Sequence, residues 1–228
     1  MPETGRWQNF TFTAEAVNED TAHRYHEILA DLDARSALDD SRAILERVRF
    51  VADSLIRVAI ALKPSAAVWT WEIHTTSDPD WDATCMARGK VLVGTRFVEQ
   101  LNLNNGELAT LLAHEFANVL AEHQREELSE VVLSDPMHRD IGIDTAVSRW
   151  ETDLGLQIRL GALSRIQESE ADQIGMILAH RAGWPVTSIA SCYQKLADAD
   201  SPTFRAWSHP SAASRLDTAQ IFAVLLSQ

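Results

Sequence analysis

Apolar side chains recur every three or four residues in the first part of the chain, which is the spacing of amphipathic helices. After Asp39 one such stripe contains Ile44, Val48, Val51, Leu55, Val58 and Leu62. Asp40 or Ser41 could cap the start of this helix, and Pro64 ends it. We therefore predict N-terminal helices over residues 1–63.

After Pro64 the period changes to two. In VWTWEIHTT, the apolar residues Trp69, Trp71 and Ile73 alternate with polar ones, which is typical of a half-buried strand. The segment KVLVGTRF predicts a second, shorter strand, and we interpret DATCMARGK before it as a loop. A small sheet is therefore expected after the first helices.

A second set of helices follows the sheet. Asn104 with Glu107 three residues later forms a capping-box pattern, which predicts a helix that continues to about Glu127. Residues 64–128 would thus hold the sheet and this helix. Its buried face is predicted to consist of Leu108, Leu111, Leu112, Phe116, Val119 and Leu120.

The remaining chain divides into a loop region over 129–163, part of which could be helical, and a helical region over 164–228. In the latter, Ser164 could cap a helix that stops at Gly183 and Pro185, and a last helix follows SHPSAAS. The pattern as a whole predicts a single domain over 1–228, of mostly helical α+β class.

Composition limits the partners. The chain has 228 residues, of which 46% are hydrophobic and 23% charged, as in globular proteins, and its formal net charge is −13. Such a charge repels phosphate backbones, so nucleic acid is not an expected partner. No apolar run could span a bilayer. Cys85 and Cys192 could form a disulfide or be two free thiols.

The beginning of the chain, MPETGRWQNF, has no apolar signal-peptide core. This leaves two expectations for location: a cytoplasmic protein, or an exported one whose leader was removed before the numbering starts.

The stretch LLAHEFANVLAEH carries the first candidate chemistry. Helix residues four apart share a face, so His114 and Asn118 could reach one metal ion, with Glu115 beside them to deprotonate a metal-bound water. The pattern is that of the H-E-x-x-H zinc helix with Asn118 at the second histidine. His123 lies nine residues after His114, about 180° round a continuous helix, and is predicted to pack or cap.

A third ligand is available in QESEAD. Glu168 and Asp172 share a helix face, so Glu168 could ligate the metal while Asp172 accepts a hydrogen bond from His114. Glu170 is turned by roughly 200° from Glu168 and is predicted to face solvent. Taken singly, such pairs are more often solvated surface residues or satisfied core histidines, and they indicate a site only together.

These motifs, in order, resemble those of the HtpX/BepA-type zinc metallopeptidases, in particular the small bacterial periplasmic members. The resemblance rests on the segments TGRWQNFTF, WTWEIH, CMARGKVLVGTRFVEQLNLNNGELATLLAHEFANVLAEHQRE, LSRIQESEADQIGMILAHRAGWP and SHPSAASRL. It implies a zincin-like (gluzincin) fold with the sheet beside the active helix, one zinc ion per chain, a polypeptide substrate and a role in protein quality control. It also favours the periplasm, with membrane association only through a trimmed lipoprotein leader.

The resemblance assigns roles residue by residue. His114 matches the first zinc histidine, Glu115 the general base, and Glu168 the glutamate ligand. Asp172 and Arg215 match supporting residues. His209 matches the histidine that relatives place near the oxyanion, although it could also be a turn residue before Pro210.

Two departures lie at the centre. Asn118 replaces the second zinc histidine, and Asp82, Ala87 and Arg88 stand where relatives differ. An amide oxygen is a weak zinc ligand, so zinc could be weakly held or absent.

Two hypotheses follow: a zinc-dependent endopeptidase that acts on unfolded or misassembled polypeptides, and an inactive binding module that keeps the fold and the groove. A third, weaker hypothesis uses His138 as a replacement ligand.

Overall fold

The computed structural model describes residues 5–134, 140–199 and 210–227, and helices make up most of them. The helices are α1 (Ala14–Ala34), α2 (Arg42–Leu62), the 3-10 helix η1 (Pro64–Val68), α3 (Thr95–Gln100), α4 (Asn105–Leu120), α5 (His123–Leu133), α6 (Ile143–Thr152), α7 (Leu154–Arg181), α8 (Val186–Asp198) and α9 (Ala212–Leu226). The strands are β1 (Glu72–Thr76), β2 (Ala83–Met86) and β3 (Lys90–Gly94). The predicted mostly helical class with a small sheet is confirmed.

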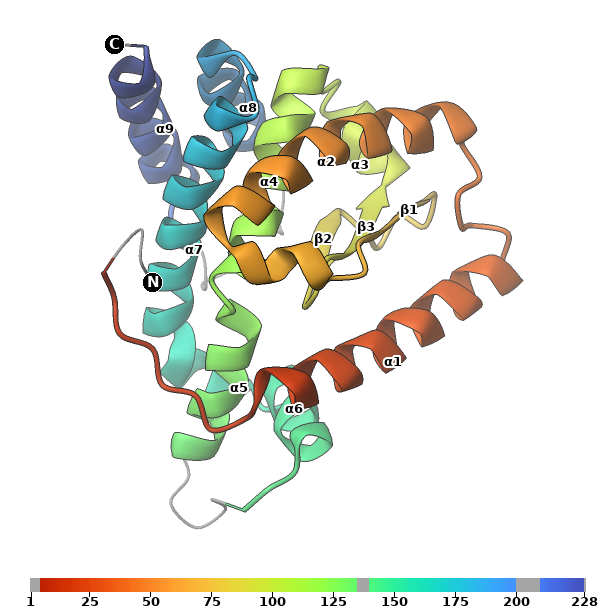
Figure 1. Ribbon diagram of the computed structural model, residues 1–228, viewed down its shortest axis with the longest axis vertical. Helices are drawn as coiled ribbons and strands as arrows, with labels where there is room; N and C mark the ends of the chain where they lie inside the picture. Colours follow the sequence, from red (N-terminus) through yellow and green to blue (C-terminus); the bar gives the residue numbers. More distant parts are fainter. Residues whose placement is uncertain (1–4, 135–139, 200–209, 228) are drawn as a thin grey trace.

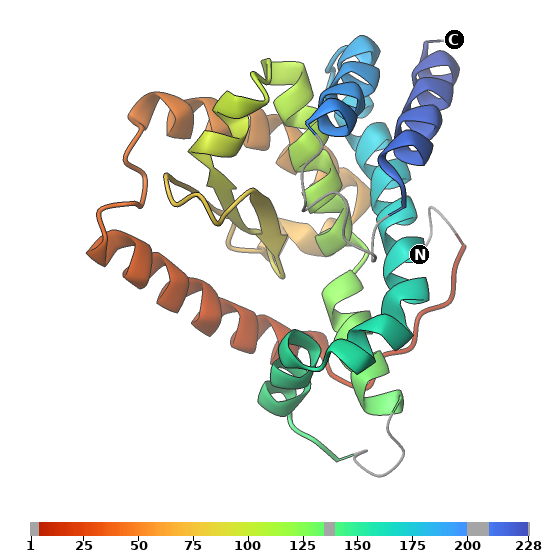
Figure 2. The same cartoon turned by 180° about the vertical axis from the view of Figure 1, so that it is seen from behind.

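The three strands lie in the order β1-β3-β2, with β1 parallel and β2 antiparallel to β3. Helices α2 and α4 cover one face of this sheet, and α1 crosses the other (Figures 1 and 2). On the α1 side, the Tyr25 hydroxyl donates to the carbonyl of Val91, and Leu32 packs with Leu92. Helices thus lie against both faces of the sheet, its central strand β3 is buried, and its edge strand beside α4 is β2.

Several predicted boundaries are correct. The helix predicted after Asp39 is α2, which ends before Pro64, and the capping box of Asn104 and Glu107 is present at the start of α4. The helix predicted to stop at Gly183 is α7.

Other expectations were wrong. Segment DATCMARGK contains β2 rather than a loop, and region 129–163 is largely helical, because α5, α6 and the first third of α7 occupy it. Helix α7 begins at Leu154, capped by Asp153, so Ser164 is buried inside the helix rather than capping it. Helix α8 was not predicted.

The helix that carries His114 does not continue to Glu127 as predicted. It ends at Leu120, and Glu122 adopts a left-handed conformation (φ 55°) before α5 begins. Such a conformation costs a non-glycine residue about 1–2 kcal/mol. Two cations offset this cost: Lys63 Nζ lies 2.7 Å and Arg125 Nη1 2.8 Å from the Glu122 carboxylate. The break turns the chain so that α5 runs beside α7.

Helices α4 and α7 pack closely because a glycine lies where they cross. A Cβ on Gly175 would lie 2.8 Å from the backbone nitrogen of His114, and backbone atoms cannot rotate away. We expect Gly175→Ala to lower the free energy of unfolding by about 1–3 kcal/mol, as overpacked cores do. Urea denaturation measures this, and Gly142→Ala, whose Cβ would meet no atom within 4 Å, is the matched control. Equal stabilities for the two variants would contradict the close packing.

Candidate active site

Helix α4 presents His114, Glu115 and Asn118 to one cavity. His114 is buried, while Glu115 and Asn118 are half-buried, and all three line a cavity of about 250 Å³ together with Glu168 of α7. The structure thus brings the predicted base and the three predicted metal ligands to one place. These side chains come from two helices whose packing is fixed by the crossing at Gly175.

Two carboxylates bracket the imidazole of His114. Its Nδ1 lies 2.9 Å from Asp172 Oδ1, and its Nε2 lies 3.4 Å from Glu168 Oε2. A proton on Nδ1 would be donated to Asp172, which leaves Nε2 as the ligating atom on the Glu168 side. Burial alone would lower the pKa of His114, but the charges of Glu168 and Asp172 raise it to about 10. The two carboxylates therefore favour a positive charge at the imidazole of His114.

The distance between these two groups fits a metal ion. Zinc lies about 2.0–2.2 Å from histidine nitrogen and carboxylate oxygen in tetrahedral sites, so two such ligand atoms are about 3.4 Å apart. The observed separation of 3.4 Å between His114 Nε2 and Glu168 Oε2 agrees with that edge of the tetrahedron. Two of the three expected donors are thus arranged for a cation.

The third expected donor, Asn118, is a neutral amide rather than a histidine or carboxylate. Asn118 Oδ1 lies 2.7 Å from His123 Nδ1, and this hydrogen bond uses one of the two lone pairs of the amide oxygen. Across residues 5–134, 140–199 and 210–227, no group of three or more His, Cys, Asp or Glu side chains could hold a metal. Among the described residues, Asn118 is the side chain that stands where a third protein ligand would be needed.

His123 is buried, as predicted. The prediction assumed that one continuous helix carries His114 and His123, and this assumption was wrong. The left-handed turn at Glu122 interrupts the helix, so the angle of a continuous helix does not apply. His123 contacts Asn118 through Nδ1, and its Nε2 lies 3.3 Å from Glu170 Oε2. It also lines a neighbouring cavity of about 580 Å³ with Glu115 and Glu168.

Glu170 does not face solvent as predicted. Its side chain is buried, and Arg6 Nη2 lies 2.6 Å from its Oε2. The same guanidinium binds Glu126 of α5, with 2.7 Å between Nη2 and Oε2. No local pattern in the sequence predicts the contacts of Arg6, because Arg6 and Glu170 are 164 positions apart.

Arg215 of α9 binds Asp172, the carboxylate that contacts Nδ1 of His114. Its Nε and Nη2 donate to the two oxygens of Asp172 at 2.9 and 2.7 Å, and the hydroxyl of Tyr193 donates to Asp172 Oδ1 at 2.6 Å. Burial opposes ionisation of Asp172, but Arg215 and His114 hold its pKa below the ordinary value. Tyr193 was missed because α8, which carries it, was not predicted.

Two further carboxylates next to the site have shifted pKa values. Burial raises the pKa of Glu115 to about 7, a shift that the charge of Glu168 increases and that of His114 reduces. Burial also raises the pKa of Glu127 to about 8, with Glu168 and Glu126 adding to it. Glu127 lines the same neighbouring cavity and was not singled out from the sequence.

Two predicted histidines, His209 and His138, lie outside the described residues. Both cysteines are free thiols in the structure, which rejects the disulfide alternative. Within the described ranges, no helix is both long enough and apolar enough to cross a membrane.

Known proteins provide a comparison. The sequence is 25% identical to the mitochondrial metalloendopeptidase OMA1 of Schizosaccharomyces pombe over 222 residues, which are 89% of this chain and 64% of that protein. It is 29% identical to the bovine OMA1 over 175 residues, 68% of this chain and 32% of that one. The metalloprotease YcaL of Escherichia coli is 27% identical over 206 residues, 82% of this chain and 78% of YcaL.

The chain spans 26–64% of the length of the OMA1 relatives. No solved structure is significantly similar to it. The sequence pattern of Peptidase family M48 matches residues 46–221, a range that begins in α2 and ends in α9 and includes His114, Glu168 and Arg215. Since this match covers well over half of the sequence and contains the whole arrangement around His114, the chain belongs to peptidase family M48.

Proposed function

We propose that the protein is a zinc-dependent endopeptidase that acts on extended segments of unfolded or misassembled polypeptides. The observation that carries the proposal is the 3.4 Å separation of His114 Nε2 and Glu168 Oε2 beside the carboxylate of Glu115. Family membership and the names of the OMA1 and YcaL relatives support it. From the resemblance to the HtpX/BepA-type members, we also infer that it works in the periplasm.

Each side chain has a distinct task in this proposal. His114, Glu168 and Asn118 would hold the metal, and a bound metal would supply Lewis acidity toward the scissile carbonyl and a water molecule. The carboxylate of Glu115 takes a proton from the attacking water and passes it to the leaving amine. Asp172 fixes the tautomer of His114, while Arg215 and Tyr193 hold Asp172. His209 is proposed to stabilise the oxyanion.

The edge strand β2 supports a polypeptide substrate. Its residues Ala83, Thr84 and Cys85 line the two cavities that Glu115 also lines. A peptide added to a sheet edge gains its affinity from main-chain hydrogen bonds, and it must be extended to form them. This requirement selects unfolded segments over folded proteins.

The proposal predicts a specific loss in Glu115→Gln. Replacing the base should reduce cleavage of a quenched fluorescent peptide by about 10²–10⁴-fold, because the proton acceptor is removed. The zinc content after dialysis, measured by atomic emission, should stay unchanged, because Glu115 is not a ligand.

Glu99→Gln, an exposed carboxylate of α3, is the matched control and should leave both quantities unaffected. A purified wild-type protein without zinc, or undiminished cleavage by Glu115→Gln, would reject the proposal.

A second function, a non-catalytic module that binds unfolded polypeptides, is favoured by one observation. The third donor, Asn118, is a neutral amide whose oxygen already accepts a hydrogen bond from His123. A module of this kind would bind extended peptides without zinc and without cleavage. Peptide binding by dialysed, zinc-free protein, together with the absence of cleavage when zinc is added back, would identify it.

A further inference from the structure

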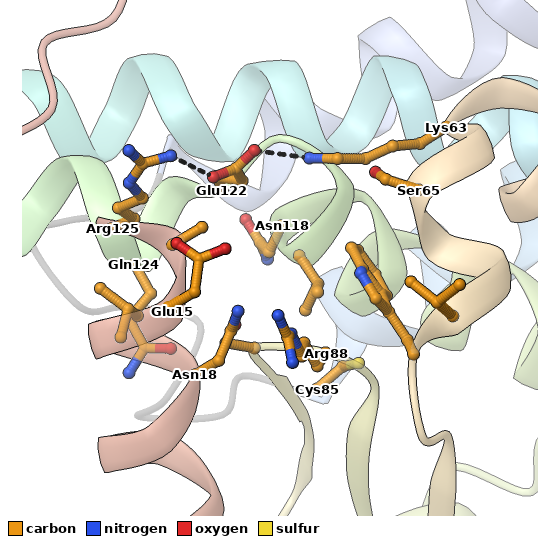
Figure 3. A pocket seen from close by; sticks show the side chains of 16 residues that line it. Glu15, Asn18, Lys63, Ser65, Cys85, Arg88, Asn118, Glu122, Gln124 and Arg125 are labelled. Atoms are coloured by element: carbon orange, nitrogen blue, oxygen red, sulfur yellow. Dashed lines mark hydrogen bonds and ion pairs between the residues drawn. The ribbon is translucent and has the colours of Figure 1, made fainter. Parts of the chain in front are cut away.

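A separate pocket of about 300 Å³ lies beyond Asn118, at the end of β2 that is followed by Arg88. It is enclosed by the first turn of α1, the segment after α2, the turn after β2, and the junction of α4 and α5 (Figure 3). Asn118 and Cys85 line both this pocket and the cavity shared by Glu115 and Glu168. A peptide that extends along β2 from the candidate active site would therefore reach it.

Most of the charges in this pocket are already compensated. Glu122 is held between Lys63 and Arg125, with separations of 2.7 and 2.8 Å (Figure 3). Glu15 lies in the first turn of α1, where the helix dipole stabilises a negative charge.

Arg88 is different. Within the described part of the chain it has no hydrogen bond or ion pair, and Figure 3 shows it entering the pocket from the side opposite Glu122. The pocket thus offers one uncompensated cation, on the turn next to the edge strand.

The backbone at Arg88 is strained. Arg88 has φ 58° and is followed by Gly89 with φ 77°, so the turn between β2 and β3 uses two left-handed residues in succession. Glycine adopts this conformation without penalty, whereas a residue with a side chain pays about 1–2 kcal/mol. Strain of this kind is concentrated at functional positions, where the side chain is needed for another purpose.

The spacing along β2 fixes where Arg88 would act. Cys85 and Glu115 line the same cavity, so the reacting carbonyl would lie near Cys85. The extended part of β2 ends at Met86, and Arg88 follows in the turn, three residues after Cys85. In an antiparallel added strand, the commoner arrangement, the residues beside the end of β2 lie on the N-terminal side of the scissile bond, about two or three residues from it.

We propose that Arg88 determines specificity by binding an aspartate or glutamate side chain of the substrate, two or three residues before the cleaved bond. The inference rests on the proposed peptide-binding function. Apolar walls from Val68, Trp69 and Val119 would contact the stem of that side chain and reduce the solvent around its carboxylate. A guanidinium in this setting pairs with the carboxylate through two parallel hydrogen bonds.

The test uses three peptides that differ only at these two positions, with glutamate, glutamine or lysine there. Binding is measured by fluorescence anisotropy on the full-length Glu115→Gln protein, so that no peptide is cut, and cleavage is measured with otherwise wild-type protein. We expect the glutamate peptide to bind about fivefold more tightly than the glutamine peptide. Arg88→Glu should reverse the order and prefer lysine.

Arg57→Glu, an exposed position of α2, changes the net charge equally and should keep the wild-type preference. Arg88→Gly relieves the strained backbone, so it should melt at a higher temperature than wild type and yet lose the preference. If Arg88→Glu folds poorly, Arg88→Gly still shows whether the preference for glutamate depends on the Arg88 side chain.

A preference for lysine in the wild type, an unchanged preference in Arg88→Gly, or no binding of any peptide would overturn the inference. Binding with the expected preference but without cleavage would instead contradict the proposed catalysis alone.

Discussion

Asn118→His is expected to bind zinc about 100-fold more tightly than the natural sequence. Well-formed zinc sites contribute about 10–16 kcal/mol, so one of four ligands is worth roughly 3 kcal/mol, which corresponds to about two orders of magnitude in Kd. The new imidazole would join His114 and Glu168, whose ligand atoms are already 3.4 Å apart. Competition with a zinc-binding dye measures the affinity, and peptide cleavage at limiting zinc should increase with it.

Asn118→Leu is the matched control, because its side chain has similar volume and no donor atom. It should bind zinc more weakly than the wild type, which separates the contribution of the amide from that of the other two ligands. If Asn118→His is folded but binds zinc no better than wild type, the cavity does not hold three ligands around one point.

Asp172→Ala is expected to lower the free energy of unfolding by about 3–5 kcal/mol, because it leaves a buried guanidinium without its principal counter-charge. Arg215 donates to both oxygens of Asp172, and the Tyr193 hydroxyl and His114 Nδ1 lose the same partner. Denaturation by urea, followed by circular dichroism, measures the loss.

Asp31→Ala removes another aspartate–arginine pair, since Asp31 Oδ2 lies 2.6 Å from Arg35 Nη2 on the exposed surface of α1. It should cost less than about 1 kcal/mol. The double variant Asp172→Leu/Arg215→Met, which removes both buried charges, should be more stable than Asp172→Ala. A loss in Asp172→Ala no greater than in Asp31→Ala would contradict the role of the buried network.

The sequence predicted those parts of the site that depend on local spacing. The capping box at Asn104 and Glu107 sets the start of α4, and positions four apart brought Glu168 and Asp172 to the same side of α7, facing His114. Both rules hold because helix geometry is independent of the rest of the chain.

The missed features depend on distant partners. The break after Leu120 is stabilised by Lys63 from the end of α2, and Glu170 is buried because Arg6 covers it. Strand β2 has only four residues and is recognised through its pairing with β3. None of these partners is close enough in sequence to leave a periodic signal.

The contacts around His114 also determine the stage of protein synthesis at which the candidate active site can form. His114 needs Glu168 and Asp172, which follow it by more than fifty positions. Asp172 in turn needs Arg215, which follows it by 43 positions. A chain emerging from the ribosome therefore exposes the helix of His114 long before it can assemble the cation site. Any metal-dependent activity would be withheld during synthesis, when neighbouring nascent chains are extended and most easily attacked.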